Sequence, residues 1–242
     1  MDSGFYAACT GLAAQTEALD VIAENLANTS TSAYKARQAT FQALVAQHQL
    51  SPASVLNQAV NNYSILGSTS QNWQQGILER TGNDLDVALE GAGLFAVQTK
   101  AGVRYTRDGN FKVSATNQLV TANGDPVLGQ NGAIPIAPGN VSISTDGTVS
   151  INGALVGKLR VVSIDPQDLS QEGAGLYSTK VTPAAANGTL VRQGMLEGSN
   201  INPVQASVQL ITVQRHAEML QRALSEFHSE FNRIAANDLP RL

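Results

Sequence analysis

The sequence predicts an α+β fold, with N- and C-terminal helices paired as a coiled-coil-like domain and an all-β domain of hairpins inserted between them. Two observations support this prediction. Apolar residues recur at helical spacing near both ends of the chain, whereas the middle contains short apolar runs interrupted by Gly. With 242 residues, 43% of them hydrophobic, the chain is long enough to form a core in one large domain or two small ones.

The N-terminal helix is predicted to run from about residue 5 to residue 28. Its apolar seam follows a heptad pattern and contains Phe5, Leu12, Leu19, Ile22 and Leu26. The opposite side of this helix carries Ala7, Ala14, Ala18 and Val21, and an acidic stripe lies between the two sides at Glu17, Asp20 and Glu24. Two opposing apolar faces indicate a helix buried on both sides, although alanine is also common in helices for its propensity alone.

The C-terminal helix is predicted to run from Pro203 to about residue 236. Asn202 is suited to cap it, and Pro203 fits the first helical position because an N–H there would have no partner in the helix. Its seam also follows the heptad pattern and contains Leu210, Val213, Leu220, Leu224, Phe227 and Phe231. Its outer face carries Val204, Val208 and Ile211, followed by Arg215, Arg222 and Arg233. Seams at both ends of one chain indicate an intramolecular helical pair.

The segment between the helices divides into two parts. Residues 32–75 are rich in Gln, Asn and Ser and lack a clear period, so we predict an extended connector there. Residues 76–195 alternate short apolar runs with Gly-containing turns, which predicts a β-rich domain. The expected strands are 85–88, 94–98, 111–113, 141–143, 149–151 and 159–164. The expected tight turns are Asp108-Gly109, Asn123-Gly124, Asp146-Gly147 and Asn152-Gly153.

The sequence lacks the patterns of catalytic, cofactor-binding and metal-binding sites. Its three histidines have no partners at metal-ligand spacing, and the single Cys9 excludes an internal disulfide and a cysteine-based zinc site. Gly91-Ala92-Gly93 precedes a predicted strand rather than a helix, so it is not a dinucleotide fingerprint. Because the net charge is −4 and Lys and Arg are scattered, we predict no nucleic-acid partner. No apolar run is long enough to span a bilayer, and we predict a non-enzyme without cofactor or metal.

Four segments of the chain carry distinctive motifs. The first contains Gly11–Gln15 and Leu19–Thr31, and the others are Asn83–Phe95, Tyr105–Phe111 and Leu196–Val204. In this order, and over nearly the whole chain, they resemble the landmarks of the flagellar basal-body rod and hook family, the axial proteins of the bacterial flagellum. The connector at 32–75 contains no such landmark.

This resemblance implies a fold and a function. It places residues 1–31 and 196–242 in an inner rod domain and residues 76–195 in a β-rich outer domain. It implies a structural subunit of the basal-body rod that polymerises by helix packing into the axial drive shaft and transmits torque for motility. The motif Leu196–Asn200 most resembles that of the proximal rod protein, with the distal rod protein or a hook-type paralogue as alternatives.

The resemblance also implies partners and a location. The expected partners are other copies of the chain, neighbouring rod proteins and the flagellar export apparatus. The expected location is the periplasmic rod of the basal body, reached by type III export without a cleaved signal peptide. Consistent with that route, Met1-Asp2-Ser3-Gly4 lacks the basic region of a secretory signal.

The seam residues are therefore predicted to serve subunit packing, and the charged residues to pair between subunits. Arg215, Arg222 and Arg233 lie on the face turned away from their own seam, so a neighbour's acidic stripe is the expected partner. Alternatively, both charged faces are ordinary solvated helix surfaces. In a different class of function, the chain would be a secreted soluble β-domain binding module closed by its helices, but the two-faced N-terminal helix would be superfluous there.

Overall fold

The computed structural model describes residues 2–42 and 65–238; among these, it leaves out the side chains of residues 2–8, 40–42, 65–68, 227, 230–232 and 234–238. The chain divides into two units. The first unit combines Met1–Ala27, Arg37–Asn72 and Asn202–Leu242, and the second combines Asn28–Ala36 and Trp73–Ile201. We describe each unit by itself.

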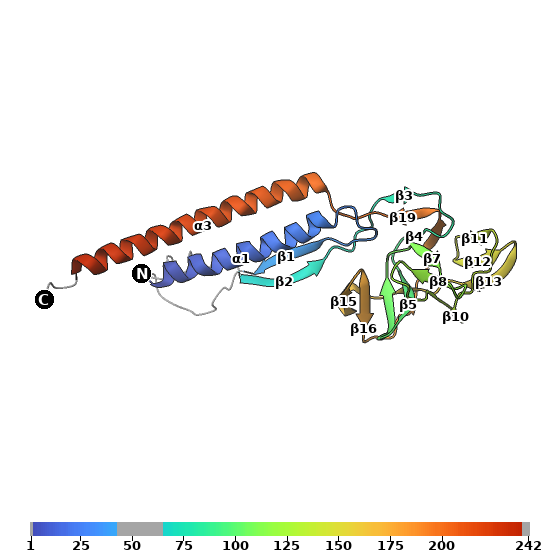
Figure 1. The fold of residues 1–242 in the computed structure, drawn as a ribbon. Coiled ribbons are helices and arrows are strands. Elements are labelled where there is room, and N and C mark those ends of the chain that lie inside the picture. The colour runs from blue at the N-terminus through green and yellow to red at the C-terminus, as the bar shows by residue number, and fades with distance from the viewer. Residues whose placement is uncertain (1, 43–64, 239–242) are drawn as a thin grey trace. The chain divides into compact units, whose positions relative to one another are not determined.

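The first unit contains two long helices, α1 (Asp2–Ala27) and α3 (Pro203–Asp238), which pack against each other (Figure 1). Both predicted helices are confirmed. At about 1.5 Å per residue, the 26 residues of α1 span about 39 Å and the 36 residues of α3 about 54 Å, so α3 extends beyond its partner.

The start of α3 has the cap that the sequence predicts. The Asn202 side-chain oxygen accepts hydrogen bonds from the N–H groups of Val204 (3.0 Å) and Gln205 (3.1 Å). Pro203 is the first residue of the helix, where its missing N–H leaves no donor unpaired. These bonds satisfy backbone donors that the first turn of a helix leaves without partners.

Two strands of the first unit lie where the sequence indicates only an extended connector. Strand β1 (Arg37–Gln42) pairs antiparallel with β2 (Ile65–Gln71), and both strands contact α1. These strands are mostly polar and contain few of the alternating apolar residues that mark a half-buried strand, which explains why the pattern does not reveal them. Residues 43–64 of the expected connector lie outside the described residues.

The second unit is built almost entirely from short antiparallel strands. Its strands are β3 (Leu78–Arg80), β4 (Val87–Glu90), β5 (Leu94–Thr99), β6 (Gly102–Thr106), β7 (Phe111–Val113), β8 (Leu119–Thr121), β9 (Leu128–Gly129), β10 (Gly132–Ala133), β11 (Val141–Ile143), β12 (Thr148–Ile151), β13 (Ala154–Lys158), β14 (Val161–Ser163), β15 (Leu169–Gly173), β16 (Leu176–Thr179), β17 (Ala184–Ala185), β18 (Leu190–Gln193) and β19 (Met195–Glu197). One 3₁₀ turn, η1 (Pro166–Asp168), precedes β15. The α+β class and the β-hairpins are thus confirmed.

The strands form several small sheets around two apolar clusters. The largest sheet has the order β15-β16-β6-β5-β14-β17, and the chain ends of the unit meet where β3 pairs with β19. In the larger cluster, Phe95 and Phe111 meet edge to face with ring centroids 5.1 Å apart. In the smaller cluster, Trp73 lies 5.0 Å from Tyr177, centroid to centroid.

Glycine is required at two of the predicted turn positions for different physical reasons. Asn152 and Gly153 both have positive φ, 51° and 83°, and join β12 to β13 as a tight hairpin turn. Gly109 does not have positive φ, so Asp108-Gly109 is not the tight turn that the sequence predicts. A Cβ atom at Gly109 would overlap the carbonyl oxygen of Val87, so this glycine is required by close backbone approach instead.

Candidate functional site

The deepest burial on α1 lies on its alanine face rather than on its leucine seam. Ala14, Ala18 and Val21 are at most 7% exposed. The seam residues Leu12, Leu19, Ile22 and Leu26 are only half-buried, and the side chain of Phe5 lies outside the described residues. Because α1 contacts both α3 and the β1–β2 pair, small side chains at close approach are covered almost completely. The larger seam side chains keep exposed surface.

The predicted seam of α3 is covered to a similar, partial extent. Ala206 and Ala217 are buried, whereas Leu210, Val213, Leu220 and Leu224 are half-buried. The side chains of Phe227 and Phe231 lie outside the described residues. The outer face of α3 is exposed at Val204 (72%), Val208 (59%), Ile211 (52%) and Met219 (57%).

The charged residues predicted to pair between subunits differ in whether they have a described ion-pair partner within the chain. Glu17 and Asp20 are exposed on α1, and Arg215, Arg222 and Arg233 are exposed on α3. Glu24 already has a partner, because its carboxylate pairs with Arg37 of the same chain at 2.5 Å. Asn25 also fixes Arg37, since its side chain exchanges hydrogen bonds with the Arg37 backbone. The end of α1 is therefore tied to β1.

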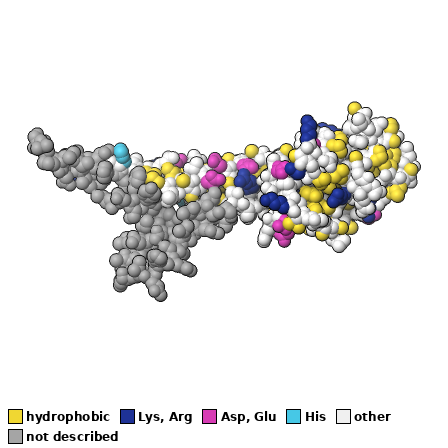
Figure 2. Space-filling view, turned by 90° about the horizontal axis from the view of Figure 1, so that it is seen from below, with side chains coloured by type: hydrophobic (Ala, Val, Ile, Leu, Met, Phe, Trp, Pro, Cys, Tyr) yellow, Lys and Arg dark blue, Asp and Glu magenta, His cyan; other side chains and the backbone are white. Residues whose placement is uncertain are grey.

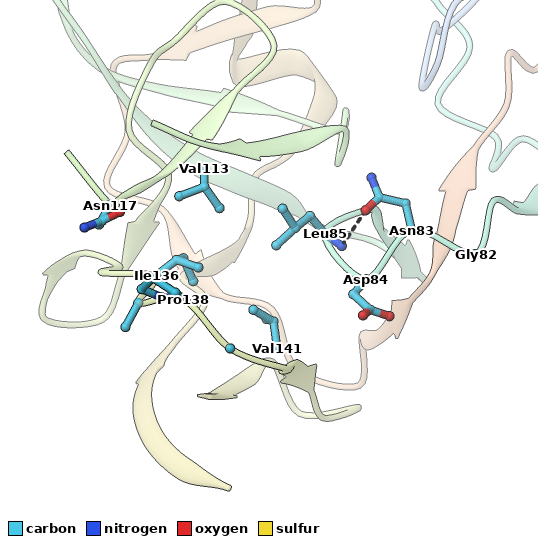
Figure 3. Close-up of a pocket in the computed structure, with 11 residues that line it drawn as sticks. Gly82, Asn83, Asp84, Leu85, Val113, Asn117, Ile136, Pro138 and Val141 are labelled. Carbon is cyan, nitrogen blue, oxygen red and sulfur yellow. Dashed lines mark hydrogen bonds between the residues drawn. The ribbon is translucent and has the colours of Figure 1, made fainter. Parts of the chain in front are cut away.

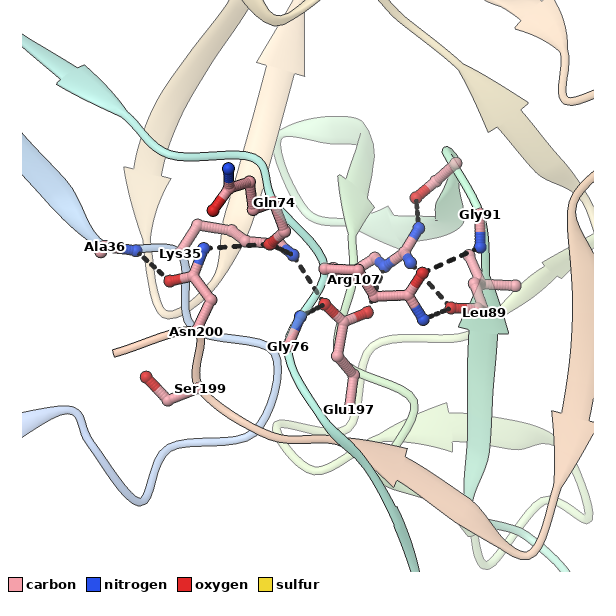
Figure 4. A network of polar contacts seen from close by, with 12 residues as sticks. Lys35, Ala36, Gln74, Gly76, Leu89, Gly91, Arg107, Glu197, Ser199 and Asn200 are labelled. Atoms are coloured by element: carbon pink, nitrogen blue, oxygen red, sulfur yellow. Dashed lines mark hydrogen bonds and ion pairs between the residues drawn. The ribbon is translucent and has the colours of Figure 1, made fainter. Parts of the chain in front are cut away.

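A buried ion network lies inside the second unit (Figure 4). Its centre is the Glu197 carboxylate, which lies 2.6 Å from the Lys35 ammonium through Oε1 and 2.6 Å from Arg107 Nε through Oε2. All three side chains are at most 5% exposed. The backbone N–H of Gly76 also donates to Glu197 Oε1, at 3.0 Å.

The cations of this network also bind backbone oxygens. The Lys35 ammonium donates to the Gln74 carbonyl at 2.8 Å, and the Arg107 guanidinium donates to the carbonyls of Gly93 and Leu89 at 2.6 and 2.7 Å. Nearby, the Asn200 side chain accepts from the Ala36 N–H at 2.8 Å. The network thus joins segments that are far apart in the sequence, and every buried charge in it has a partner.

Burial and charge act against each other on the pKa values of this network. Burial lowers the pKa of Lys35, and the hydrogen bond to Glu197 only partly offsets that effect. For Glu197, burial by itself would raise the pKa, but the charge of Arg107 and the hydrogen bond from Lys35 outweigh it and hold the pKa below its usual value. Glu197 is therefore the ionised counter-ion of both cations.

The sequence prediction did not identify this network. Arg107 and Glu197 do lie in two of the four distinctive segments, and Lys35 follows the end of the first. Both segments mix polar and apolar residues, so their sequence does not mark Arg107 or Glu197 as buried. The partners themselves could not be inferred, because ion pairing between distant segments follows from the folded chain and not from spacing.

The described residues form a surface hollow but no cluster of metal ligands. Among them, no group of three or more His, Cys, Asp or Glu side chains is placed to hold a metal ion. A shallow hollow of about 440 Å³ lies beside Leu85, Val113 and Ile136 (Figure 3). Of the described residues that line it, Asp84 is the one with a charge. The described lining does not place an acid beside a base, the arrangement that general acid–base catalysis uses.

The distribution of charge on the surface and the apolar character of the helices bear on nucleic-acid and membrane binding. Figure 2 shows basic and acidic side chains interspersed on the face in view, rather than gathered into a basic patch. Of the helices in the described part of the chain, none combines the length and the apolar character needed to cross a bilayer.

Three family models match the chain. One described as flagella basal body rod protein matches residues 5–35, and one described as flagellar hook protein FlgE/F/G D1 domain matches residues 88–151. The model described as flagellar basal body rod FlgEFG protein C-terminal matches residues 192–234. These matches fall on both helices and on the β-rich unit.

Curated relatives extend this similarity over most or all of the chain. A flagellar basal-body rod protein FlgF from Caulobacter vibrioides is 34% identical, with all of both chains covered. FlgF from Salmonella typhimurium is 32% identical over 93% of this chain and 94% of its own. FlgG from Buchnera aphidicola is 33% identical over 89% of this chain and 92% of its own. The chain therefore belongs to the flagellar basal-body rod protein family.

Proposed function

We propose that this chain is a structural subunit of the bacterial flagellar basal-body rod, and that it polymerises with copies of itself and with neighbouring rod proteins. The observation that supports this most strongly is the outer face of α3. Val204, Val208, Ile211 and Met219 recur along one side of the helix and are all more than half exposed. At about 25 cal/mol per Å² of apolar surface, covering such a face in every subunit gives a substantial and repeated driving force for assembly.

The half-buried seams supply further packing surface. Leu12, Leu19, Ile22 and Leu26 on α1 keep exposed area, as do Leu210, Val213, Leu220 and Leu224 on α3. We assign these residues, together with Phe5, Phe227 and Phe231, to a coiled-coil-like inner rod domain in which each helix packs within its own chain and against neighbours. Residues 76–195 form the β-rich outer domain of the same subunit, joined to the inner domain through residues 32–75.

This arrangement suits a drive shaft. A contact between two different surfaces of identical subunits, repeated without closing into a ring, generates a helical polymer. Torque would pass along the polymer through side-by-side helices, with no chemical step in the subunit. A secreted β-domain binding module has no comparable use for an apolar stripe on a helix that extends beyond its partner.

We further propose that the subunit resides in the periplasmic rod and reaches it through the flagellar type III export apparatus, without a cleaved signal peptide. Relatives named FlgF and FlgG both cover most of the chain. Because relatives with two different names match the chain similarly, the matches do not assign a position in the rod. The proximal position suggested by the motif Leu196–Asn200 stays a prediction, with the distal position as its alternative.

The test replaces two residues of the apolar stripe in the full-length chain. Val208→Asp with Ile211→Asp should remove the subunit from purified basal bodies and abolish motility, because each charge must be desolvated at the contact. The matched control, Gln209→Asp with Thr212→Asp, adds the same charge to exposed positions beside the stripe. Equal incorporation of both variants, with unchanged unfolding of the purified chains, would contradict the proposed packing role.

A further inference from the structure

A small cavity of the second unit lies against two of its buried cations. Its volume is about 260 Å³, and its lining includes Lys35, Trp73, Leu94, Arg107, Ile164 and Leu169. Small-molecule sites typically measure roughly 300–1,000 Å³, so this cavity suits one or two side chains better than a cofactor. Its walls are mainly apolar, and its charged lining residues are both positive.

The charge of this cavity is not fully balanced. Lys35 and Arg107 line it, whereas their shared counter-ion Glu197 does not. Two cations and one carboxylate leave the network with a net positive charge. Two of the three Lys35 N–H donors and three of the five Arg107 donors have described acceptors, so donors remain for another anion. Burial lowers the pKa of Lys35, and an additional carboxylate nearby would relieve that cost.

The same unit presents a segment of complementary chemistry on its surface. Ile77 is 76% exposed, and Glu79 is an exposed carboxylate in β3 for which no ion pair is described. Residues two apart in extended chain lie on the same side, so Ile77 and Glu79 form an apolar and acidic ridge. An exposed isoleucine in water next to an unpaired carboxylate matches an apolar cavity with excess positive charge.

We propose that the cavity receives the ridge of Ile77 and Glu79 from a second copy of the chain, with Glu79 facing Lys35 and Arg107 and Ile77 packing against Trp73 and Leu169. This inference rests on the proposed function as a rod subunit. Cavity and ridge are different surfaces of one unit, so the contact is heterologous and continues from copy to copy. Asp165 follows Ile164 at the cavity, but we do not count it as the missing counter-ion, because its side chain already accepts a hydrogen bond from the Gln167 N–H.

The contact is tested by mixing two single-cysteine versions of the full chain, both carrying Cys9→Ser. One has Glu79→Cys and the other Ser163→Cys, since Ser163 also lines the cavity. On mild oxidation we expect the mixed disulfide to form in excess of either homodimer. A chain with Asp84→Cys in place of Glu79→Cys serves as the control, and it should give no excess. Equal yields of mixed disulfide from Glu79→Cys and Asp84→Cys would overturn the inference.

A second experiment separates this inference from the proposed function. We expect Glu79→Lys to reduce the amount of the subunit in purified basal bodies, and the charge-matched Asp84→Lys to leave it unchanged. If the wild-type chain is found in the rod and Glu79→Lys enters it equally well, the ridge contact is wrong and the rod function stands. If the wild-type chain is absent from purified rods, the proposed function fails first. Trp73, the single tryptophan of the sequence, reports by fluorescence whether the cavity of each variant is intact.

Discussion

At the scale of single residues, we expect the buried carboxylate of Glu197 to contribute more to the free energy of unfolding than an exposed charge does. It neutralises two buried cations, and removing it would leave both of them in a site with almost no access to water. We expect Glu197→Gln to lower the free energy of unfolding by roughly 3–5 kcal/mol, the range for breaking a buried ion pair. Chemical denaturation of the full chain measures this directly.

The matched control for this prediction is Glu90→Gln. Glu90 pairs with Arg192 at 2.6 Å, but these side chains are 48% and 40% exposed. Solvent screens such a pair, so its loss should cost only about 0–1 kcal/mol. Similar costs for the two substitutions would show that the buried network is not a stability determinant.

The lowered pKa of Glu197 also predicts a dependence of stability on pH. Because the folded state holds this pKa below its usual value, the unfolded chain binds the proton more readily in the acidic range. The stabilisation is fully present above the unfolded pKa, about 4.3 for glutamate, and is lost as pH falls through the lower folded pKa. Unfolding curves measured through this acidic window should show the loss in the wild type and a flatter profile in Glu197→Gln.

Gly109 is a single position where the fold leaves no room for a side chain. A side chain there would collide with the Val87 carbonyl, a backbone atom that cannot move aside cheaply. We expect Gly109→Ala to destabilise the chain by about 1–3 kcal/mol, as in overpacked cores. Gly157→Ala is the comparison, because among the described residues no atom beyond the chain neighbours lies within 4 Å of its added Cβ. A thermal unfolding midpoint shared by both variants would contradict the steric explanation.

At the scale of elements, the two helices were predictable and their packing was only partly so. Heptad spacing and the Asn202-Pro203 start identify α3 because they depend on local periodicity. For α1 the sequence predicted burial on two opposing faces, the seam with Leu12, Leu19 and Leu26 and the side with Ala14, Ala18 and Val21, without ranking them. Within the chain, the structure buries the alanine side more completely than the seam. Which of two apolar faces is covered depends on the neighbouring elements, and the polar strand β1 gave no signal of its presence.

This burial pattern yields a prediction for α1. Ala18 is 4% exposed, so Ala18→Leu forces extra carbon atoms into a packed contact and should cost about 1–3 kcal/mol. Ala23 is exposed on the same helix, and Ala23→Leu should change stability by less than about 0.5 kcal/mol. Urea unfolding of both full-length variants compares them. Tolerance of leucine at residue 18 would mean that the alanine face is not closely packed in solution.

At the scale of the whole molecule, the structure shows what residues of the distinctive segments do in the fold. Arg107 and Glu197 come from two of them and meet in the buried network, and Asn200 and Asn202 fix the chain before α3. The sequence identified these segments through resemblance, but not the ion pairs that join them. Those contacts link residues as far apart as Lys35 and Glu197, and no local pattern encodes such a pairing.

Contacts between copies provide the last prediction. Glu17 and Asp20 are exposed on α1, and Arg215 and Arg222 are exposed on α3. Within the described part of the chain, none of the four forms an ion pair. Glu24 is left out because it already pairs with Arg37. We propose that the two acids of one subunit face the two arginines of a neighbour. Exposed pairs contribute only about 0–1 kcal/mol each, so their effect is mainly on the register of the polymer.

A charge exchange tests this pairing in the assembled rod. Glu17→Arg with Asp20→Arg should weaken incorporation into basal bodies, because like charges then meet across the contact. Adding Arg215→Glu and Arg222→Glu to the same chain restores opposite charges at every such contact and should recover part of the incorporation and motility. Purified chains should unfold alike throughout, since all four side chains are exposed. If the acidic reversal is harmless, or if the fourfold variant is no better than the double one, these residues are ordinary solvated helix surfaces, and the register of the rod is set by apolar packing.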